Sequence, residues 1–297
     1  MSDLTAEGAA AHVAVQLPSA TADLPRWRLL ARRPTFVVGA AIVLFWIVCA
    51  VFGHQIAPDS PLAQNLLGNN TGPAGAHWFG TDTLGRDVLS RVIVGARDIL
   101  IITPLATILG TVLGTILGLC MGYFSGIFDL LVSRVVEALL ALPAVIISFL
   151  FIVALGPSTS TLILVVGLVF TPLIARTVRA AVLTERHLDY LAAARLLGEN
   201  PLRVMVAEIL PNVLPAILVE FTVRLGYAIF AIATLSFLGF GIQPPTADWG
   251  ADIAYSYQND GLGAGYWWQT LFPALAIASL VVAINLITDS VEQVLSS

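Results

Sequence analysis

The sequence predicts an all-α membrane protein with six transmembrane helices. Of its 297 residues, 58% are hydrophobic and only 11% are charged, a balance typical of polytopic membrane proteins rather than soluble domains. Long apolar runs alternate with polar segments, and each run supplies all or most of a helix that could cross a hydrocarbon core of about 30 Å. The six runs cover residues 35–52, 99–124, 129–155, 161–175, 213–240 and 268–287.

The charged residues exclude several classes of function. A net charge of −5 argues against a nucleic-acid partner. All fourteen basic residues are arginines, and the chain contains no lysine. A nucleotide-binding P-loop and Schiff-base chemistry both need a lysine, so neither is expected in this chain. If transport here uses ATP, another subunit must hydrolyse it.

The polar segments divide the chain into four parts. Residues 1–34 lack a long apolar core, so we expect a cytoplasmic N-terminal tail rather than a cleaved signal. Residues 35–98 should hold the first span, an extracytoplasmic loop and an interfacial helix. Residues 99–290 should form a core of five further spans, and residues 291–297 a cytoplasmic tail.

The interfacial helix is predicted from an amphipathic pattern just before the second span. Its apolar side chains fall on one helical face, which suits a helix lying at the lipid surface. These side chains are Val88, Leu89, Val92, Ile93 and Ala96.

A polar block leads into this helix and has the form Gly-Thr-Asp-x-x-Gly-Arg-Asp-x-x-Ser-Arg. Its residues are Gly80, Thr81, Asp82, Gly85, Arg86, Asp87, Ser90 and Arg91. The block closely resembles the one that precedes the second span in dipeptide and oligopeptide ABC importer permeases.

Two features inside the spans predict packing and bending. Gly110, Gly114, Gly118 and Gly122 recur every four residues and give the second span one smooth face, which should pack tightly on a neighbouring helix. Pro143 should kink the third span. Near the start of that span, Arg134 and Glu137 are spaced to pair.

Glu220 and Arg224 stand one helical turn apart inside the fifth span. Ionisable residues within a membrane are costly and suggest a functional role, such as lining a water-filled translocation path. A self-neutralising structural pair explains the same spacing equally well. The sequence leaves both interpretations open.

The polar stretch from residue 185 to 211 contains a short helical pattern that stops at Gly198 and Pro201. On composition alone it could simply connect two spans. The order Ala192-Ala193-Ala194, three residues, Gly198 and then Ile209-Leu210-Pro211-Asn212 resembles the cytoplasmic coupling loop of permease subunits in bacterial ABC importers. The resemblance implies that a coupling helix docks on an ATPase through Ala193, Ala194, Arg195, Gly198 and Pro201.

A third block lies after the fifth span. Residues 236–245, Ser-Phe-Leu-Gly-Phe-Gly-Ile-Gln-Pro-Pro, and then Asp248-Trp249-Gly250 look like the extracytoplasmic loop of the same permeases. The signature positions in this loop are Gln243, Pro244 and Pro245. Tryptophan and tyrosine are frequent through residue 268, as is typical of a membrane interface.

The resemblance implies the ABC type I importer permease fold and the import of di- or oligopeptides across the cytoplasmic membrane. Nickel chelates and glutathione are alternative substrates within the same class of importer. The expected partners are a second six-span permease subunit, related but different, two ATPase subunits or domains that bind ATP and magnesium, and an extracytoplasmic substrate-binding protein. This chain should itself bind no cofactor and catalyse no reaction.

The distribution of arginines supports an orientation with both termini on the cytoplasmic side of the inner membrane. With six spans both termini share one side, and ten arginines then lie inside against three outside, as the positive-inside rule requires. The ten inside are at positions 26, 28, 32, 33, 134, 176, 179, 186, 195 and 203, and the three outside are at 86, 91 and 97.

Two other classes are less consistent with the sequence. An ion-coupled secondary transporter could use Glu137, Glu220 and Arg224, but such folds usually carry paired halves, and the chain shows no convincing internal repeat. An intramembrane enzyme would need a base near Ser148 or Ser236, and all four histidines lie outside the spans.

Overall fold

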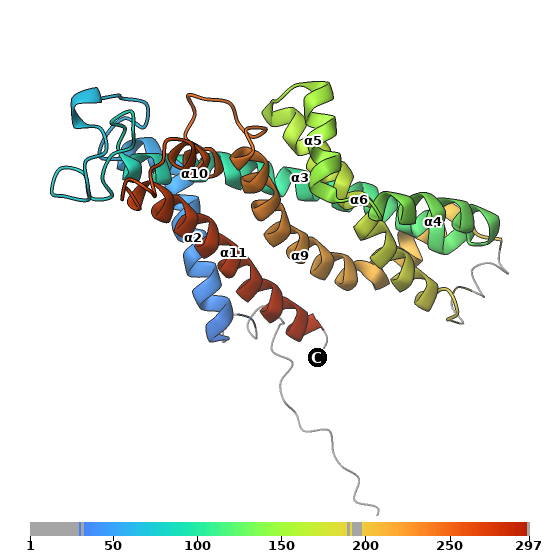
Figure 1. The fold of residues 1–297 in the computed structure, drawn as a ribbon. Coiled ribbons are helices and arrows are strands. Elements are labelled where there is room, and N and C mark those ends of the chain that lie inside the picture. Colours follow the sequence, from blue (N-terminus) through green and yellow to red (C-terminus); the bar gives the residue numbers. More distant parts are fainter. Residues whose placement is uncertain (1–29, 31–32, 189–190, 192–197, 296–297) are drawn as a thin grey trace, which may run out of the picture.

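The computed structural model describes residue 30, residues 33–188, residue 191 and residues 198–295. Within them the regular elements are helices (Figure 1). In chain order they are α2 (Pro34–Ile56), η1 (Leu66–Gly68), α3 (Val88–Phe124), α4 (Gly126–Leu140), α5 (Ala144–Leu155), α6 (Thr159–Glu185), α8 (Pro201–Arg203), η2 (Val204–Ile209), α9 (Leu210–Phe237), α10 (Trp249–Gln258) and α11 (Trp268–Leu295). The short η1 is a 3-10 helix and η2 is a single π-helical segment.

Within these described residues, five helices are long and apolar enough to cross a membrane, and a sixth span results if α4 and α5 are counted together. This confirms the predicted all-α membrane fold. The five are α2, α3, α6, α9 with the short segments before it, and α11. The third span is the exception, because α4 and α5 meet at an angle of 88°. The break falls at Pro143, which caps α5 and cannot continue the hydrogen bonding of α4.

The predicted separate interfacial helix before the second span is wrong. Residues 88–98 are the first turns of α3, which continues without a break to Phe124. The apolar face of these turns packs on protein, since Val88, Val92 and Ala96 are buried together with side chains of α2, α10 and α11. With 37 residues, α3 is about 55 Å long, which exceeds the thickness of a hydrocarbon core.

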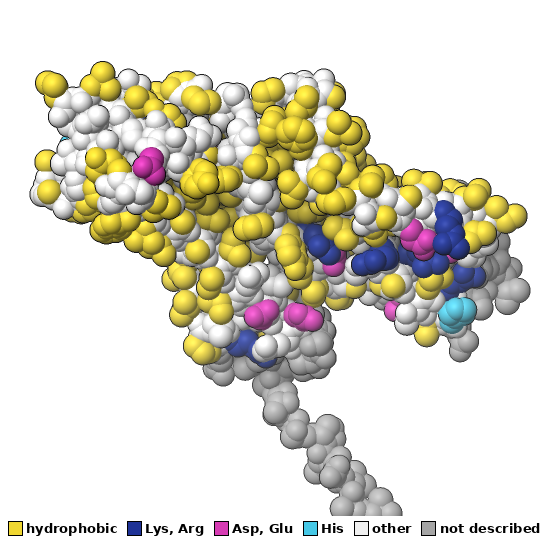
Figure 2. Space-filling model, viewed as in Figure 1, with side chains coloured by type: hydrophobic (Ala, Val, Ile, Leu, Met, Phe, Trp, Pro, Cys, Tyr) yellow, Lys and Arg dark blue, Asp and Glu magenta, His cyan; other side chains and the backbone are white. Residues whose placement is uncertain are grey.

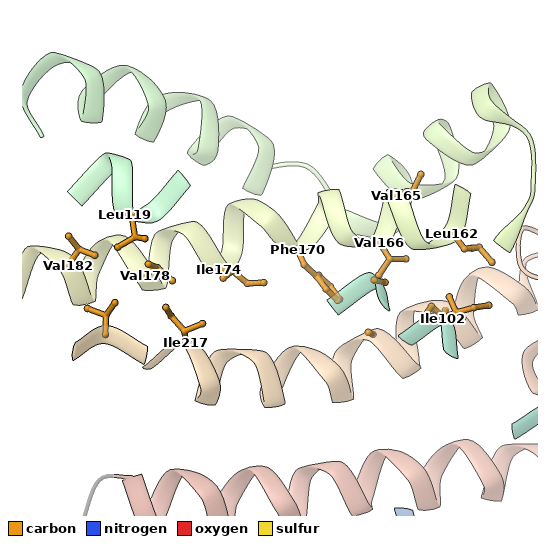
Figure 3. Close-up of a cluster of buried hydrophobic side chains, with 14 of the residues drawn as sticks. Ile102, Leu119, Leu162, Val165, Val166, Phe170, Ile174, Val178, Val182 and Ile217 are labelled. Atoms are coloured by element: carbon orange, nitrogen blue, oxygen red, sulfur yellow. The ribbon is translucent and has the colours of Figure 1, made fainter. Parts of the chain in front are cut away.

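The glycine ladder of α3 lies against α6, as predicted. A Cβ atom at Gly114 would come within 2.7 Å of the Cβ of Ile174, and one at Gly118 within 2.7 Å of the Ala175 carbonyl oxygen. Side chains of α6, including Ile174, continue this packing into a buried cluster with α3 and α9 (Figure 3). Small residues therefore allow α3 and α6 to form the most extensive helix contact among the described elements.

A second buried cluster joins the two ends of the chain. Trp46 of α2 packs edge-on against Trp249 of α10, with ring centroids 4.8 Å apart. The indole nitrogen of Trp46 donates to the Ser279 hydroxyl of α11. The first and last spans thus lie side by side, with α10 across one end (Figure 1).

The outer faces of the spans are apolar. Large side chains of α2 and α4, such as Leu44, Val51 and Leu131, are more than half exposed. Figure 2 shows one such face, where hydrophobic side chains cover much of the surface and charged ones gather in a few places. Surfaces of this kind need lipid or another protein to cover them.

Candidate functional site

The block from Gly80 to Arg91 forms a tight loop at the end of the molecule that carries α10. Gly80 and Gly85 both have positive φ angles, of 73° and 70°. A Cβ atom at Gly85 would lie 1.9 Å from the Asn65 carbonyl oxygen, and one at Gly80 would lie 2.6 Å from that of Thr71. Only glycine fits these two positions, because the backbone is left-handed there and another segment of the loop approaches closely.

Asp82 organises the turn between these glycines. One of its carboxylate oxygens accepts hydrogen bonds from the backbone N–H groups of Leu84 and Arg86, both at 2.9 Å. The other accepts from Nε of Arg86 at 2.6 Å. The Arg86 guanidinium carbon lies 5.5 Å from the centre of the Tyr255 ring in α10. The turn is therefore fixed internally and held to α10 by a cation–π contact.

Asp87 caps α3 in the manner expected of an aspartate at a helix start. Its Oδ2 accepts from both the backbone N–H and the hydroxyl of Ser90, each at 2.7 Å. The carboxylate satisfies a backbone donor of the first turn and lies at the positive end of the helix dipole.

Arg91 connects the block to α10. Its Nε donates to both carboxylate oxygens of Asp252, at 2.9 and 3.1 Å, and its terminal nitrogens donate to the carbonyls of Pro61 and Thr246. Burial raises the pKa of Asp252, and the charge of Arg91 acts in the opposite direction. Both side chains are almost completely buried, so this is an ion pair inside the protein rather than at its surface.

The block after the fifth span meets the first block here. Asp248 caps α10 by accepting from Ala251 N–H at 2.8 Å, and Trp249 donates from its indole to the Val92 carbonyl at 2.9 Å. Burial raises the pKa of Asp248 to about 6. Gln243, Pro244 and Pro245 lie in the turn before this cap, where Gln243 donates to the Gly241 carbonyl at 3.1 Å.

Sequence reasoning missed α10 and the residues that receive the first block, because the stretch was interpreted as a loop. Besides Asp252 and Tyr255, the missed residues include Gln269, whose side-chain nitrogen donates to the Thr81 carbonyl at 3.0 Å. The available signal was Asp248, an N-cap residue with an acidic residue in the first turn after it.

The structure gives only part of the predicted coupling helix. Ala193, Ala194 and Arg195 lie outside the described residues. Gly198 has a φ of 71° with open space around its Cα, and Pro201 begins α8 after an Asn200 side-chain cap. This segment follows α6, whose final turns lie far from α10 (Figure 1).

Glu220 and Arg224 form a salt bridge within α9. The Glu220 Oε1 accepts from Nε of Arg224 at 2.6 Å, and a terminal nitrogen lies 2.5 Å away. The guanidinium carbon also stands 5.4 Å from the centre of the Tyr227 ring. The two charges therefore neutralise each other locally, which both interpretations of the pair allow.

A cavity of about 730 Å³ lies in the bend between α4 and α5, against α6. Its walls include Leu139, Phe151 and Leu168, and Thr171 is the one residue with a polar side chain among those that line it. A ligand with charged termini needs converging polar groups, so this cavity by itself suits apolar contacts.

Comparison with known proteins decides the family. Residues 110–297 match the family described as the binding-protein-dependent transport system inner membrane component. The chain belongs to this family. Residues 26–73 also match the N-terminal transmembrane domain of oligopeptide transport permease C. The chain is therefore an ABC importer permease of the dipeptide and oligopeptide type.

Individual relatives resemble the chain over nearly its whole length. The dipeptide transport system permease protein DppC of Bacillus subtilis is 36% identical over 95% of this chain and 87% of its own. A putative peptide transport system permease protein of Brucella suis is 40% identical over 90% of this chain and 89% of its own. The glutathione transport system permease protein GsiD of Shigella flexneri is 38% identical over 91% of this chain and 88% of its own.

Proposed function

We propose that this chain is the membrane-spanning subunit of an ATP-driven importer that carries di- or oligopeptides across the cytoplasmic membrane. The observation that carries the proposal is the near full-length similarity to permeases named for dipeptide and peptide transport. Glutathione, itself a short peptide, is the alternative substrate, because a glutathione permease is similar over almost the same extent.

The energy source would lie in partner subunits. The chain has no lysine with which to build a P-loop, so we propose that it hydrolyses no ATP and that two cytoplasmic ATPase subunits or domains bind ATP and magnesium. Their docking element would be the coupling stretch that ends at Gly198 and Pro201. The distribution of arginines supports a cytoplasmic position for this stretch and for both termini.

A second permease subunit would complete the pathway. The helices expose large apolar faces, and the cavity beside α4 and α5 offers apolar contacts but almost no polar groups for a peptide. We propose a related but different six-span chain as this partner, and an extracytoplasmic binding protein that delivers the peptide.

The test is to purify the chain with its co-purifying subunits, reconstitute the complex in proteoliposomes and measure uptake with the binding protein present. Dialanine, tetra-alanine and glutathione would be compared as labelled substrates. We expect uptake only with ATP and magnesium on the side of the coupling stretch, and saturation at a lower concentration of dialanine or tetra-alanine than of glutathione. Uptake that persists without ATP and follows an ion gradient would instead indicate a secondary transporter.

A further inference from the structure

We propose that Asp59, His77 and Asp87 form a binding site for a divalent metal ion and that the site prefers Zn²⁺. The three residues lie in the loop between α2 and α3 and at its junction with α3. One ligand atom from each lies within 4.8 Å of the others. The site is separate from the coupling stretch and from the pair in α9.

The two distances from His77 fit a tetrahedral ion, and the two carboxylates lie at most 4.8 Å apart. The His77 Nδ1 lies 3.0 Å from Oδ1 of Asp87 and 3.6 Å from Oδ2 of Asp59. With bonds of about 2.0–2.2 Å to nitrogen and oxygen, neighbouring ligands of tetrahedral zinc stand roughly 3.4 Å apart. The two observed separations bracket that value, so an ion could enter with small side-chain movements.

Hydrogen bonds fix the carboxylate of Asp87 and the backbone of Asp59 and His77. The Ser90 hydroxyl donates to Oδ2 of Asp87 at 2.7 Å and accepts from the backbone N–H of Asp59 at 3.0 Å. This leaves Oδ1 of Asp87 facing His77. The His77 carbonyl accepts from the N–H groups of Ala74 and Gly80, both at 3.0 Å. A hydrogen bond to a ligating carboxylate, such as the one from Ser90 to Asp87, strengthens metal binding.

The local charge calls for a cation. Two carboxylates approach each other here, and Asp87 is only 3% exposed. In the part of the chain that the structure describes, the ion pairs connect neither carboxylate to an arginine, and His77 is the basic partner of both. A neutral imidazole with two carboxylates is a nitrogen and oxygen ligand set that suits zinc, whereas calcium and magnesium prefer oxygen ligands alone.

The consequence would be a brace for the loop. An ion here would tie Asp59, just after α2, to the cap of α3 and to the turn before Gly80. It would therefore fix the base of the loop that contains the first signature block, residues 80–91. This block packs against α10.

The experiment measures Zn²⁺ binding to the purified complex in nanodiscs after treatment with a chelator, without ATP, magnesium or substrate. Equilibrium dialysis with metal analysis would compare the wild type with His77→Gln and Asp59→Asn. His54→Gln, an exposed histidine in the last turn of α2, is the matched control. Asp87 is left intact because it caps α3. Zinc bound by partner subunits cancels in these comparisons.

We expect His77→Gln and Asp59→Asn each to weaken one class of zinc site by at least about tenfold, with His54→Gln unchanged. Zinc should also raise the thermal unfolding midpoint of the wild type and the control but not of the two site variants. Zinc binding that is the same in the wild type and both variants, or absent from the wild type, would overturn the proposal and leave the contact between His77 and Asp87 as a structural hydrogen bond. Because no transport is measured, failure here is separable from failure of the proposed function.

Discussion

At the scale of single residues, the charges near α10 are matched inside the protein rather than presented to solvent. Arg91 reaches Asp252 and two backbone carbonyls, and Asp82 satisfies two backbone donors besides Arg86. Buried charges of this kind stabilise only when their partners are present, because an uncompensated charge keeps its full desolvation penalty. The first signature block is therefore a structural connector to α10.

Replacing Arg91 tests this connection. Arg91→Met should destabilise the protein by about 3–5 kcal/mol, since it leaves Asp252 buried without its partner. Arg134→Met is the control, because Arg134 pairs with an exposed Glu137, and it should cost at most about 1 kcal/mol. Unfolding free energies of the two variants in detergent would show the difference. Equal small losses would mean that the Arg91 pair contributes little to stability.

Asp248 predicts a pH dependence. Its raised pKa of about 6 means that the folded protein keeps this proton at pH values where the unfolded chain has lost it. The stability from this group is therefore complete below about pH 4, falls as the pH rises from about 4 to about 6, and stays lower above that range. The total loss would be about 3 kcal/mol.

Asp248→Asn should remove this contribution, since the amide oxygen can still cap α10 and the side chain no longer ionises. Unfolding midpoints of the wild type and the variant, measured between pH 4 and pH 7, should converge at low pH and diverge in favour of the variant near pH 7. A constant difference across the range would contradict the assignment.

The pair in α9 can be tested by removing both charges together. Glu220→Leu combined with Arg224→Met should keep the complex assembled under either interpretation, because the double change leaves no unpaired charge. Glu220→Leu alone should reduce assembly, as it isolates Arg224. Loss of uptake in an assembled double variant would assign the pair to the translocation path, whereas normal uptake would make it structural.

At the scale of elements, the close approach of α3 and α6 holds the core of the bundle. In lipid no hydrophobic force drives helices together, so close packing of small residues supplies the contact. The repeat of glycines along α3 removes the side chains that would otherwise separate the two backbones. This packing runs continuously from Gly110 to Gly122.

Gly114→Leu should therefore destabilise the protein by at least about 1–3 kcal/mol, because its Cβ alone would collide with Ile174. Val112→Phe is a control on the same helix, since Val112 is 51% exposed and can grow outward. The yield of folded protein in membranes and the unfolding midpoint in detergent would measure both effects. A Gly114→Leu variant as stable as the control would show that α6 can move away at no cost.

At the scale of the whole molecule, the two ends differ in kind. The α10 end is an assembly of buried ion pairs and helix caps, whereas α6, which precedes the coupling stretch in the sequence, ends far from α10 (Figure 1). An importer that is driven from the cytoplasm needs a docking element separate from the α10 end, so that a motion of the ATPases can move the spans.

Gly198→Trp should preserve membrane insertion while abolishing ATPase attachment or its coupling to uptake, because a bulky side chain would stand at the end of the proposed docking stretch. Gly156→Trp is the matched control, since Gly156 also has a positive φ and open surroundings but lies between α5 and α6. Co-purification of the ATPase and peptide-stimulated hydrolysis would be compared. Normal assembly and uptake in Gly198→Trp would defeat the docking assignment.

The sequence alone determined the class of fold and the packing face of α3, and its six predicted spans compare with five or six candidate spans in the described residues. Hydrophobic length specifies a membrane helix almost without context, and the glycine repeat has one physical use in lipid. Pro143 likewise marked the break between α4 and α5, although not its angle of 88°.

Only the tertiary structure decided what the amphipathic start of α3 packs against and which residues receive the first signature block. An apolar helix face has the same sequence pattern whether lipid or protein covers it. Here it packs against Trp249 and Trp268, more than 150 positions further along the chain. The pairing of Arg91 with Asp252 and the convergence of Asp59, His77 and Asp87 arise in the same way, because contacts between distant positions leave no local pattern in the chain.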